Sequence, residues 1–150
     1  MKMIKEESLS KNRAKVIETT IAIESMISTA TTNHYFGEIN LNFMLEVMFD
    51  EYFTSALKIR ILKKVFPNKV DNEKENKLRR IINIRNLFAH CNTRIYNGAK
   101  WVIIYPKDYD RGFSKQKGFG GVDFDKLYKE FEELNREVTE FLQALIPQLR

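Results

Sequence analysis

Arg85, Asn86 and His90 are the residues whose types and spacing could do chemistry together. A histidine side chain can accept or donate a proton near neutral pH. A guanidinium can hold a phosphate through two parallel hydrogen bonds and stabilise the charge that develops on it. An asparagine next to that arginine can orient either group or bind the substrate. These three residue types are therefore compatible with acid–base chemistry on a phosphate.

A helix that ends near His90 must position these side chains. Asp71 or Asn72 can accept the first free N–H groups of this helix, and Glu75 follows Asn72 at the spacing of a capping box. On a helical wheel, His90 lies about 140° from Arg85 but only about 40° from Asn86.

One face of the same predicted helix is apolar, and Arg85 lies near its middle. The apolar residues of this face are Leu78, Ile81, Ile82, Phe88 and Ala89. Because burial of an unpaired cation loses several kcal/mol of hydration, Arg85 needs a carboxylate, a carbonyl cluster, an open cleft or a bound anion.

The segment Arg85-Asn86-Leu87-Phe88-Ala89-His90 resembles the R-x4-6-H motif of the HEPN (higher eukaryotes and prokaryotes nucleotide-binding) superfamily. The resemblance covers roughly residues 10 to 146. It implies a four-helix bundle with the motif on the third helix. It also implies a metal-independent endoribonuclease without a cofactor, which cleaves RNA in a cleft between two protomers of a homodimer. The resemblance makes Arg85 and His90 the expected catalytic residues and places Asn86 in substrate binding. The expected product is a 2′,3′-cyclic phosphate, and the expected role is that of a toxin or defence effector, with an antitoxin or regulatory protein as a candidate partner.

Two alternatives stay open. The chain could be a non-catalytic HEPN-like module that makes protein or nucleotide contacts through the same cleft. Arg85 and His90 could also be structural, with Arg85 bonded to a buried acid and His90 capping the last helical carbonyls. The candidate acids are Glu24, Glu46 and Asp50. Asn92 stands where a subset of the superfamily, the one paired with nucleotidyltransferase antitoxins, has a tyrosine, which puts that pairing in doubt.

The remaining patterns predict a mainly α fold, an up-and-down bundle of four helices with a small β-hairpin before the last. An amphipathic helix is expected from about Ser10 to Ala30, with Gly37 ending the region. Its stripe contains Val16, Ile17, Thr20, Ile21, Ile23, Ile27 and Ala30. One long helix is expected from Asn40 to Phe66, before Pro67.

A β-hairpin is expected at 93–105, because Asn97-Gly98 suits a two-residue turn between β-prone flanks. Residues 106–121 are expected to form a loop. The hairpin and this loop together make an insertion before the last helix, which spans about 93–121. Asp123 can cap a last helix that ends before Pro147. The apolar positions of this helix alternate spacings of three and four: Phe124, Leu127, Phe131, Leu134, Val138, Phe141 and Leu145.

Basic side chains suggest where RNA could bind. Arg111, Lys115 and Lys117 are interleaved with aromatic residues in the predicted loop, a mixture that can follow a phosphate backbone and stack bases, although such loops are often simply solvated. We interpret the other basic clusters as polar faces of helices. They comprise Lys58, Arg60, Lys63, Lys64, Arg79 and Arg80.

Length, composition and charge limit the classes of protein to which this chain could belong. The 150 residues, 43% hydrophobic and 30% charged, suit one domain over 1–150. Net charge is +5, with a net of −4 at residues 123–142 and therefore +9 elsewhere, a split that fits a polyanionic partner on one side. Cys91 stands alone and no Cys/His spacing indicates a zinc site, so no metal is expected. No apolar run is long enough to cross a membrane, and we expect a cytoplasmic protein.

Overall fold

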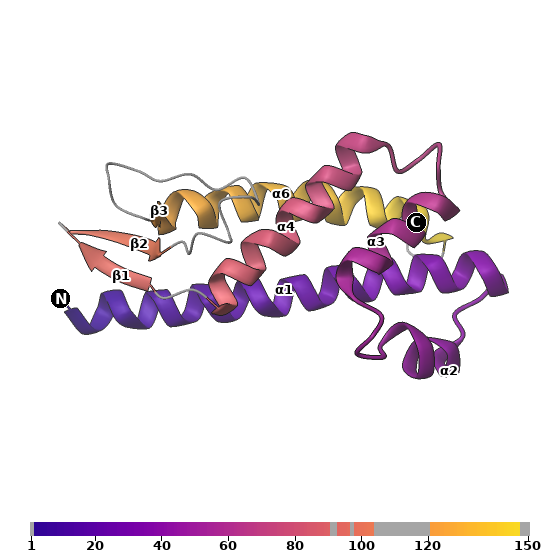
Figure 1. The fold of residues 1–150 in the computed structure, drawn as a ribbon, viewed down its shortest axis with the longest axis horizontal. Helices are drawn as coiled ribbons and strands as arrows, with labels where there is room; N and C mark the ends of the chain where they lie inside the picture. The colour runs from indigo at the N-terminus through magenta and orange to yellow at the C-terminus, as the bar shows by residue number, and fades with distance from the viewer. Residues whose placement is uncertain (1, 91–92, 97, 104–120, 148–150) are drawn as a thin grey trace. The chain divides into compact units, whose positions relative to one another are not determined.

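The computed structural model describes residues 2–90, 93–96, 98–103 and 121–147, and this part of the chain is mainly helical (Figure 1). Its helices are α1 (Lys2–Phe36), α2 (Leu41–Phe43), the π-helix η1 (Met44–Met48), α3 (Ser55–Val65), α4 (Asn72–His90) and α6 (Phe124–Leu145). Its strands are β1 (Thr93–Tyr96), β2 (Ala99–Ile103) and β3 (Gly121–Asp123). The predicted mainly α class is confirmed.

Contacts group the chain into two compact units. The first unit comprises Met1–Thr19 and Asn83–Glu133, and the second comprises Thr20–Ile82 and Leu134–Arg150. The unit boundaries fall inside α1, α4 and α6, so these three helices each contribute residues to both units. The expectation of a single domain stays a prediction, and each unit is described by itself.

Helix α1 is longer than its apolar pattern predicts, since it begins at Lys2 rather than near Ser10. It ends where the sequence indicates: Gly37 has a φ of +72° and donates its N–H to the Asn33 carbonyl at 2.8 Å. This left-handed conformation at a helix end favours glycine. Ile21, which the pattern placed in the buried stripe, is 59% exposed.

The single helix predicted over Asn40–Phe66 is wrong, because the segment breaks between Met48 and Ser55. The Asp50 carboxylate accepts from the Tyr52 N–H at 2.9 Å, which forms a local turn. The Thr54 hydroxyl then accepts from the Leu57 N–H at 3.3 Å and caps α3. Two short polar side chains therefore override a nearly continuous apolar periodicity.

The predicted hairpin is present in the first unit, and β3 extends it to a three-stranded antiparallel sheet. Tyr96 pairs with Ala99, so the link between β1 and β2 is the expected two residues, and Gly98 has a φ of +76°. Strand β3 pairs with β2 in the register Trp101–Asp123. This strand was not predicted, because three residues give too short a pattern to recognise.

Helix α6 begins as predicted, since the Asp123 carboxylate accepts from the Lys126 N–H at 2.9 Å. Most of its expected apolar positions are buried, but Leu142 rather than Phe141 lies in the core near the end of the helix. Phe141 is half-buried and lines a groove described below.

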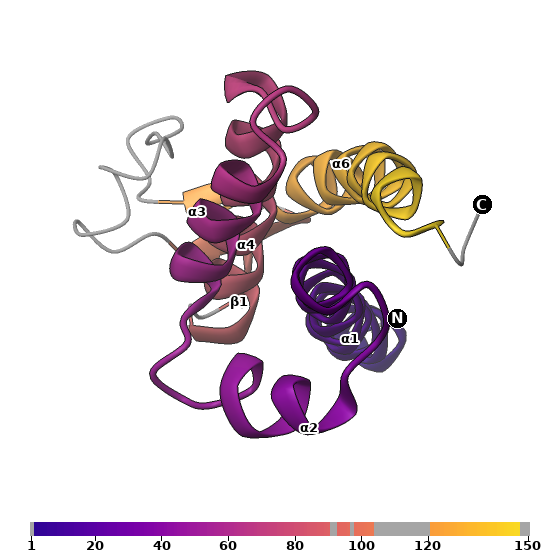
Figure 2. The same cartoon turned by 90° about the vertical axis from the view of Figure 1, so that its right-hand side faces the viewer.

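Each unit buries its own apolar side chains. In the first unit, the Phe88 and Phe124 rings meet edge to face at 4.9 Å between centroids, both fully buried. In the second unit, α3 lies beside α4 (Figure 2). Lys63 of α3 is ion-paired with Glu75 of α4. Among the described residues, no helix combines the length and apolarity that crossing a membrane requires.

Candidate functional site

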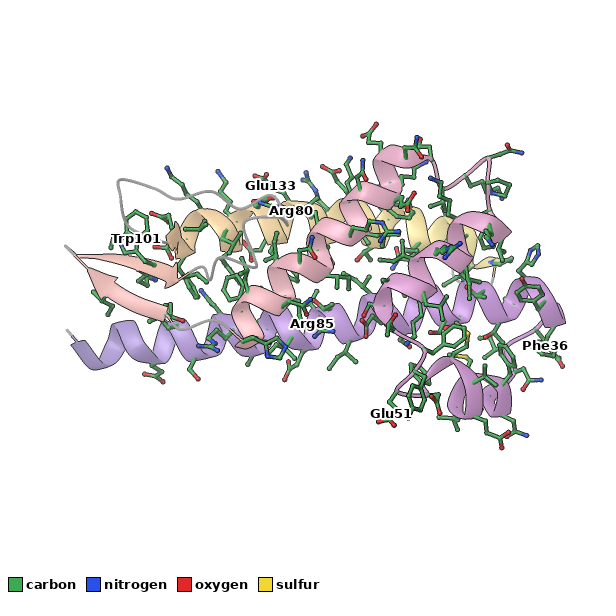
Figure 3. The ribbon with its side chains drawn as sticks, viewed as in Figure 1. Phe36, Glu51, Arg80, Arg85, Trp101 and Glu133 are labelled. Carbon is green, nitrogen blue, oxygen red and sulfur yellow. The ribbon has the colours of Figure 1, made fainter. Side chains whose placement is uncertain are left out.

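The motif Arg85–His90 occupies the last turns of α4, in the first unit (Figure 3). The helix starts where Asp71 accepts from the Lys74 N–H at 2.9 Å, so Asp71 rather than Asn72 is its cap. The capping box predicted between Asn72 and Glu75 is wrong, because the side chains of both accept from Lys63. The helix ends at His90, as predicted.

Arg85 is half-buried and lies at the margin of the buried face of α4, not at its middle. Ile84 and Leu87, which the wheel left outside the apolar face, are buried at 0% and 2% exposure. Ile82 and Ala89, which the wheel placed inside it, are only half-buried. The buried face is therefore rotated from its predicted position, and the long Arg85 side chain starts from its edge.

Asn86 and His90 lie on the outward side of the same turns. Asn86 is half-buried and His90 is exposed, and the spacing of four residues places one above the other on the helix surface. The predicted proximity of Asn86 and His90 on one side is consistent with these burial classes. An exposed imidazole and a half-buried guanidinium on neighbouring turns can reach one ligand from the same helix.

Arg13 of α1 is a basic residue near this helix end that the sequence did not single out. Its Nη1 donates to the Thr93 hydroxyl at 3.2 Å, and Thr93 opens β1 three residues after His90. Because the partner is a neutral hydroxyl, this hydrogen bond does not itself neutralise the positive charge of Arg13. The two residues are 80 positions apart in the chain, so no local pattern connects them.

Two other cations of the first unit, Lys15 and Lys100, are paired with carboxylates. Lys15 lies 3.4 Å from Glu132, and Lys100 lies 3.0 Å from Asp125. The Lys100 ammonium also lies 5.6 Å from the centre of the Phe124 ring, a cation–π contact. These ion pairs join the sheet and α1 to α6. Arg13 is therefore a better candidate than Lys15 or Lys100 to bind an external anion.

The predicted RNA-binding residues Arg111, Lys115 and Lys117 lie outside the described residues. Their role stays a prediction.

The basic residues of α3 and α4 in the second unit are mostly structural. Lys63 and Arg79 both donate to the Glu75 carboxylate, Arg79 at 2.8 Å. The hydrogen bond from Lys63 and then that from Arg79 hold the pKa of Glu75 below its usual range. Lys58 departs from the expected polar face, since it is 5% exposed and its ammonium lies 5.1 Å from the centre of the Phe49 ring.

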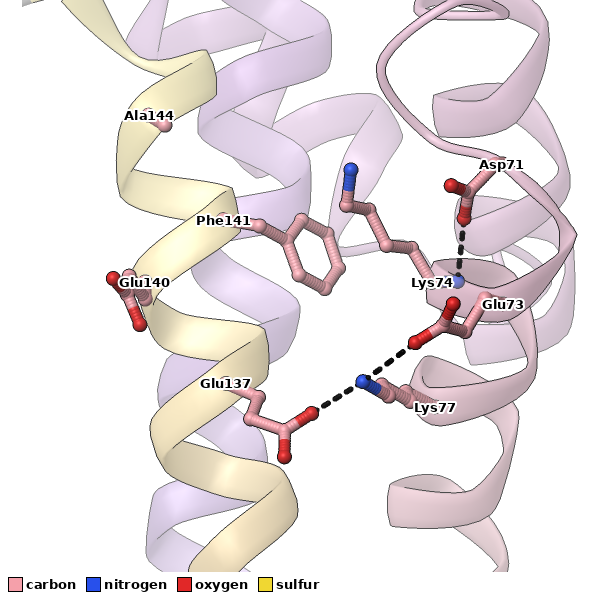
Figure 4. Close-up of a pocket in the computed structure, with 8 residues that line it drawn as sticks. All are labelled: Asp71, Glu73, Lys74, Lys77, Glu137, Glu140, Phe141 and Ala144. Carbon is pink, nitrogen blue, oxygen red and sulfur yellow. Dashed lines mark hydrogen bonds and ion pairs between the residues drawn. The ribbon is translucent and has the colours of Figure 1, made fainter.

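A groove of about 460 Å³ lies between α4 and α6 in the second unit (Figure 4). Lys77 reaches across it between Glu137 and Glu73, whose carboxylates raise the lysine pKa, and it lowers the pKa of Glu137 in turn. The Lys74 ammonium lies 6.0 Å from the centre of the Phe141 ring. Lys77 thus pairs with two of the four carboxylates that line the groove, and this ion pairing joins α4 to α6 as a structural contact between helices.

In the part of the chain that the structure describes, no group of three or more His, Cys, Asp or Glu side chains could hold a metal ion. Comparison with known proteins gives no match to a family model, to a curated protein or to a solved structure. The HEPN resemblance therefore depends on the motif residues and on the helices that carry them.

Proposed function

We propose that this chain is a HEPN-type, metal-independent endoribonuclease that acts in the cytoplasm as a toxin or defence effector. The observation that carries the proposal is the placement of Arg85 and His90 on the last turns of one helix, with the imidazole exposed and the guanidinium half-buried. Asn86, one turn before His90, supports a shared ligand for the three side chains.

The proposed reaction is transesterification within RNA. The ribose 2′-oxygen attacks the adjacent phosphorus while a histidine accepts the hydroxyl proton. The bond from phosphorus to the 5′-oxygen breaks, and a protonated histidine gives that oxygen a proton. The products are a 2′,3′-cyclic phosphate and a 5′-hydroxyl. Arg85 binds the non-bridging oxygens and stabilises the charge that they gain in the transition state.

A homodimer fits this chemistry because the reaction needs one proton acceptor and one proton donor. In a twofold dimer, a site beside the symmetry axis receives an Arg85-His90 pair from each protomer. One imidazole then acts as base and the other as acid. Arg13 adds a positive charge near the same end of α4 in each protomer.

The test is cleavage of a defined single-stranded RNA in the presence of EDTA, with the product ends analysed. We expect the wild-type chain to leave 2′,3′-cyclic phosphates and His90→Gln to lose at least about a hundredfold in rate, since acid–base catalysis contributes about 10²–10⁴-fold. Arg85→Ala should lose rate similarly, and Arg85→Lys should recover little because lysine cannot form the bidentate contact.

The matched control is His34→Gln, which alters the other histidine of the chain. His34 lies in the second unit, where its ring contacts Tyr35 and Phe66, so this variant should cleave like the wild type. Equal cleavage by the wild type and His90→Gln, with both chains folded and dimeric, would exclude the nuclease and favour the non-catalytic module.

A further inference from the structure

The second unit exposes an unusual concentration of large apolar side chains between the end of α1 and the start of α3. We call this the outer apolar surface. It comprises Tyr35, Phe36, Ile39, Leu41, Leu45, Val47, Phe49 and Tyr52. Leu41 is 65% exposed, Leu45 67% and Tyr52 82%. Large exposed apolar side chains gathered within one short segment are typical of a contact site.

The segment that carries this surface is anchored from its inner side. Met44 and Met48 are buried at 6% and 1% exposure, one turn apart in η1. Asn40 caps α2 by accepting from the Phe43 N–H at 2.9 Å, and the Phe36 and Phe43 rings lie 5.0 Å apart. The exposed side chains are therefore presented on fixed backbone rather than on a frayed end.

Apolar residues thus occupy both sides of the α2–η1 segment, although only one side is covered. Leu41, Leu45 and Phe49 recur every four residues on the outer side, offset from Met44 and Met48 on the inner side. A helix side that carries large apolar residues normally faces a packed core or a partner. Figures 1 and 2 show α2 on the side of α1 away from α6, and Leu41 and Leu45 are 65% and 67% exposed.

The charges beside the outer apolar surface indicate which kind of partner could cover it. No Lys or Arg occurs between Lys15 and Lys58, a stretch with six acidic residues in a chain of net charge +5. Four of the six lie beside the outer apolar surface, and all four are exposed: Glu38, Glu46, Asp50 and Glu51. This acidic border repels RNA and anionic membranes. It also opposes a twofold contact with a second copy, because the same carboxylates would face one another.

We propose that the outer apolar surface docks a basic amphipathic helix of a partner protein. The partner's apolar face would cover Leu41, Leu45 and Tyr52, and its flanking Lys or Arg side chains would meet Glu46 and Glu51. This surface is separate from the Arg85–His90 motif, which belongs to the first unit. The proposal therefore stands whether or not the chain cleaves RNA.

The test uses two labelled helical peptides of about 18 residues with the same leucine stripe, one with Lys and one with Glu on its polar face. Fluorescence anisotropy with the full chain, at a salt concentration of about 0.15 M, gives both affinities. We expect the Leu/Lys peptide to bind at least about tenfold more tightly than the Leu/Glu peptide. The double variant Leu45→Ser/Tyr52→Ser should lose at least that factor. The double variant Glu46→Lys/Glu51→Lys should reverse the preference.

Matched controls separate this surface from general stickiness and from general acidity. Ile95→Ser changes an apolar residue that is 39% exposed in the first unit and should leave peptide affinity unchanged. Glu133→Lys/Glu140→Lys adds the same charge on the exposed side of α6 and should not reverse the preference. Circular dichroism of every variant confirms that helix content is retained.

Three results would overturn the proposal. The first is equal binding of the two peptides, or binding that survives Leu45→Ser/Tyr52→Ser. The second is a wild-type oligomer in sedimentation velocity that this double variant dissociates, which would make the surface a contact between copies. The third is binding to phosphatidylcholine or phosphatidylserine vesicles that the double variant abolishes, which would make it a membrane contact.

Discussion

At the residue scale, Glu75 links stability to pH. Its carboxylate accepts from Lys63 and from Arg79, and its side chain is 17% exposed. The pKa of Glu75 is therefore lower in the folded chain than in the unfolded chain, where it is about 4.3. A lowered folded pKa stabilises the fold at pH values above the unfolded pKa. That contribution is lost as the pH falls through the folded pKa.

The first prediction is that Glu75→Gln lowers the free energy of unfolding by about 1 kcal/mol at pH 7, the upper range for a partly exposed ion pair. The difference from the wild type should shrink below about pH 4, where the carboxylate becomes protonated. Urea unfolding across pH 3–7 measures both effects. Glu73→Gln is the control, since the Glu73 side chain is 76% exposed and its loss should change little. A Glu75→Gln effect that is constant across this range would contradict the ion-pair account.

Arg13 carries the second prediction, which depends on the proposed RNA binding. A side chain that contacts a phosphate contributes about one unit to the slope of log affinity against log salt. Arg13→Gln should therefore reduce this slope by about one, measured with a His90→Gln background that binds RNA without cleaving it. Thr93→Val removes the hydrogen bond at 3.2 Å but keeps the charge, and it should leave the slope unchanged. The same slope in Arg13→Gln and the wild type would remove Arg13 from the interface.

At the scale of elements, signals that depend on a few neighbouring residues could be predicted from the sequence. Asp71 and Asp123 cap helices, Gly37 ends one, and Gly98, with a positive φ, comes directly before the second of two paired strands, as expected. Each of these depends on local backbone sterics or on one short hydrogen bond, which sequence spacing encodes directly.

Features that depend on tertiary packing could not be predicted in the same way. The break before Ser55 interrupts an apolar pattern that also suits one long helix, and only the packed structure distinguishes buried Met44 and Met48 from exposed Leu45. The rotation of the α4 face toward Ile84 has the same origin, because a helix with apolar residues on most sides has no unique buried face.

Gly37 provides the prediction at this scale. With a φ of +72°, Gly37→Ala should lower the free energy of unfolding by about 1 kcal/mol, although nothing lies within 4 Å of the added methyl group. Gly37→Asn should lose less, because asparagine tolerates this conformation. Thermal unfolding of both variants measures the difference. Equal losses for alanine and asparagine would point to a cause other than backbone conformation.

At the scale of the whole molecule, the proposed nuclease is a dimer in which each site draws on both protomers. We expect the wild type to sediment as a dimer at assay concentrations. We also expect an excess of His90→Gln chains to suppress cleavage by wild-type chains, because a mixed dimer holds only one of the two histidines that the shared site requires. Cleavage by a wild-type monomer would contradict this prediction.

The candidate site could be predicted from the sequence only as far as its one helix. Arg85, Asn86 and His90 lie within six residues, so their shared position on α4 follows from helix geometry. Arg13 could not be found, because its hydrogen bond to Thr93 joins residues 80 positions apart. Arg13 and Arg85 of the proposed RNA site are basic, whereas Glu46 and Glu51 beside the outer apolar surface are acidic. We therefore propose different kinds of partner for the two surfaces.

Lys58 has a practical consequence for chemical labelling. It is 5% exposed, and it is the one buried lysine among those from Lys11 onward whose burial the structure describes. Amine-directed acylation should modify it more slowly than its exposed neighbour Lys64. Since Phe49 of the outer apolar surface covers its ammonium, any event that lifts this segment should accelerate the labelling of Lys58. The extent of Lys58 acylation, measured by mass spectrometry, would then report a rearrangement of the segment that carries the outer apolar surface, without an added probe.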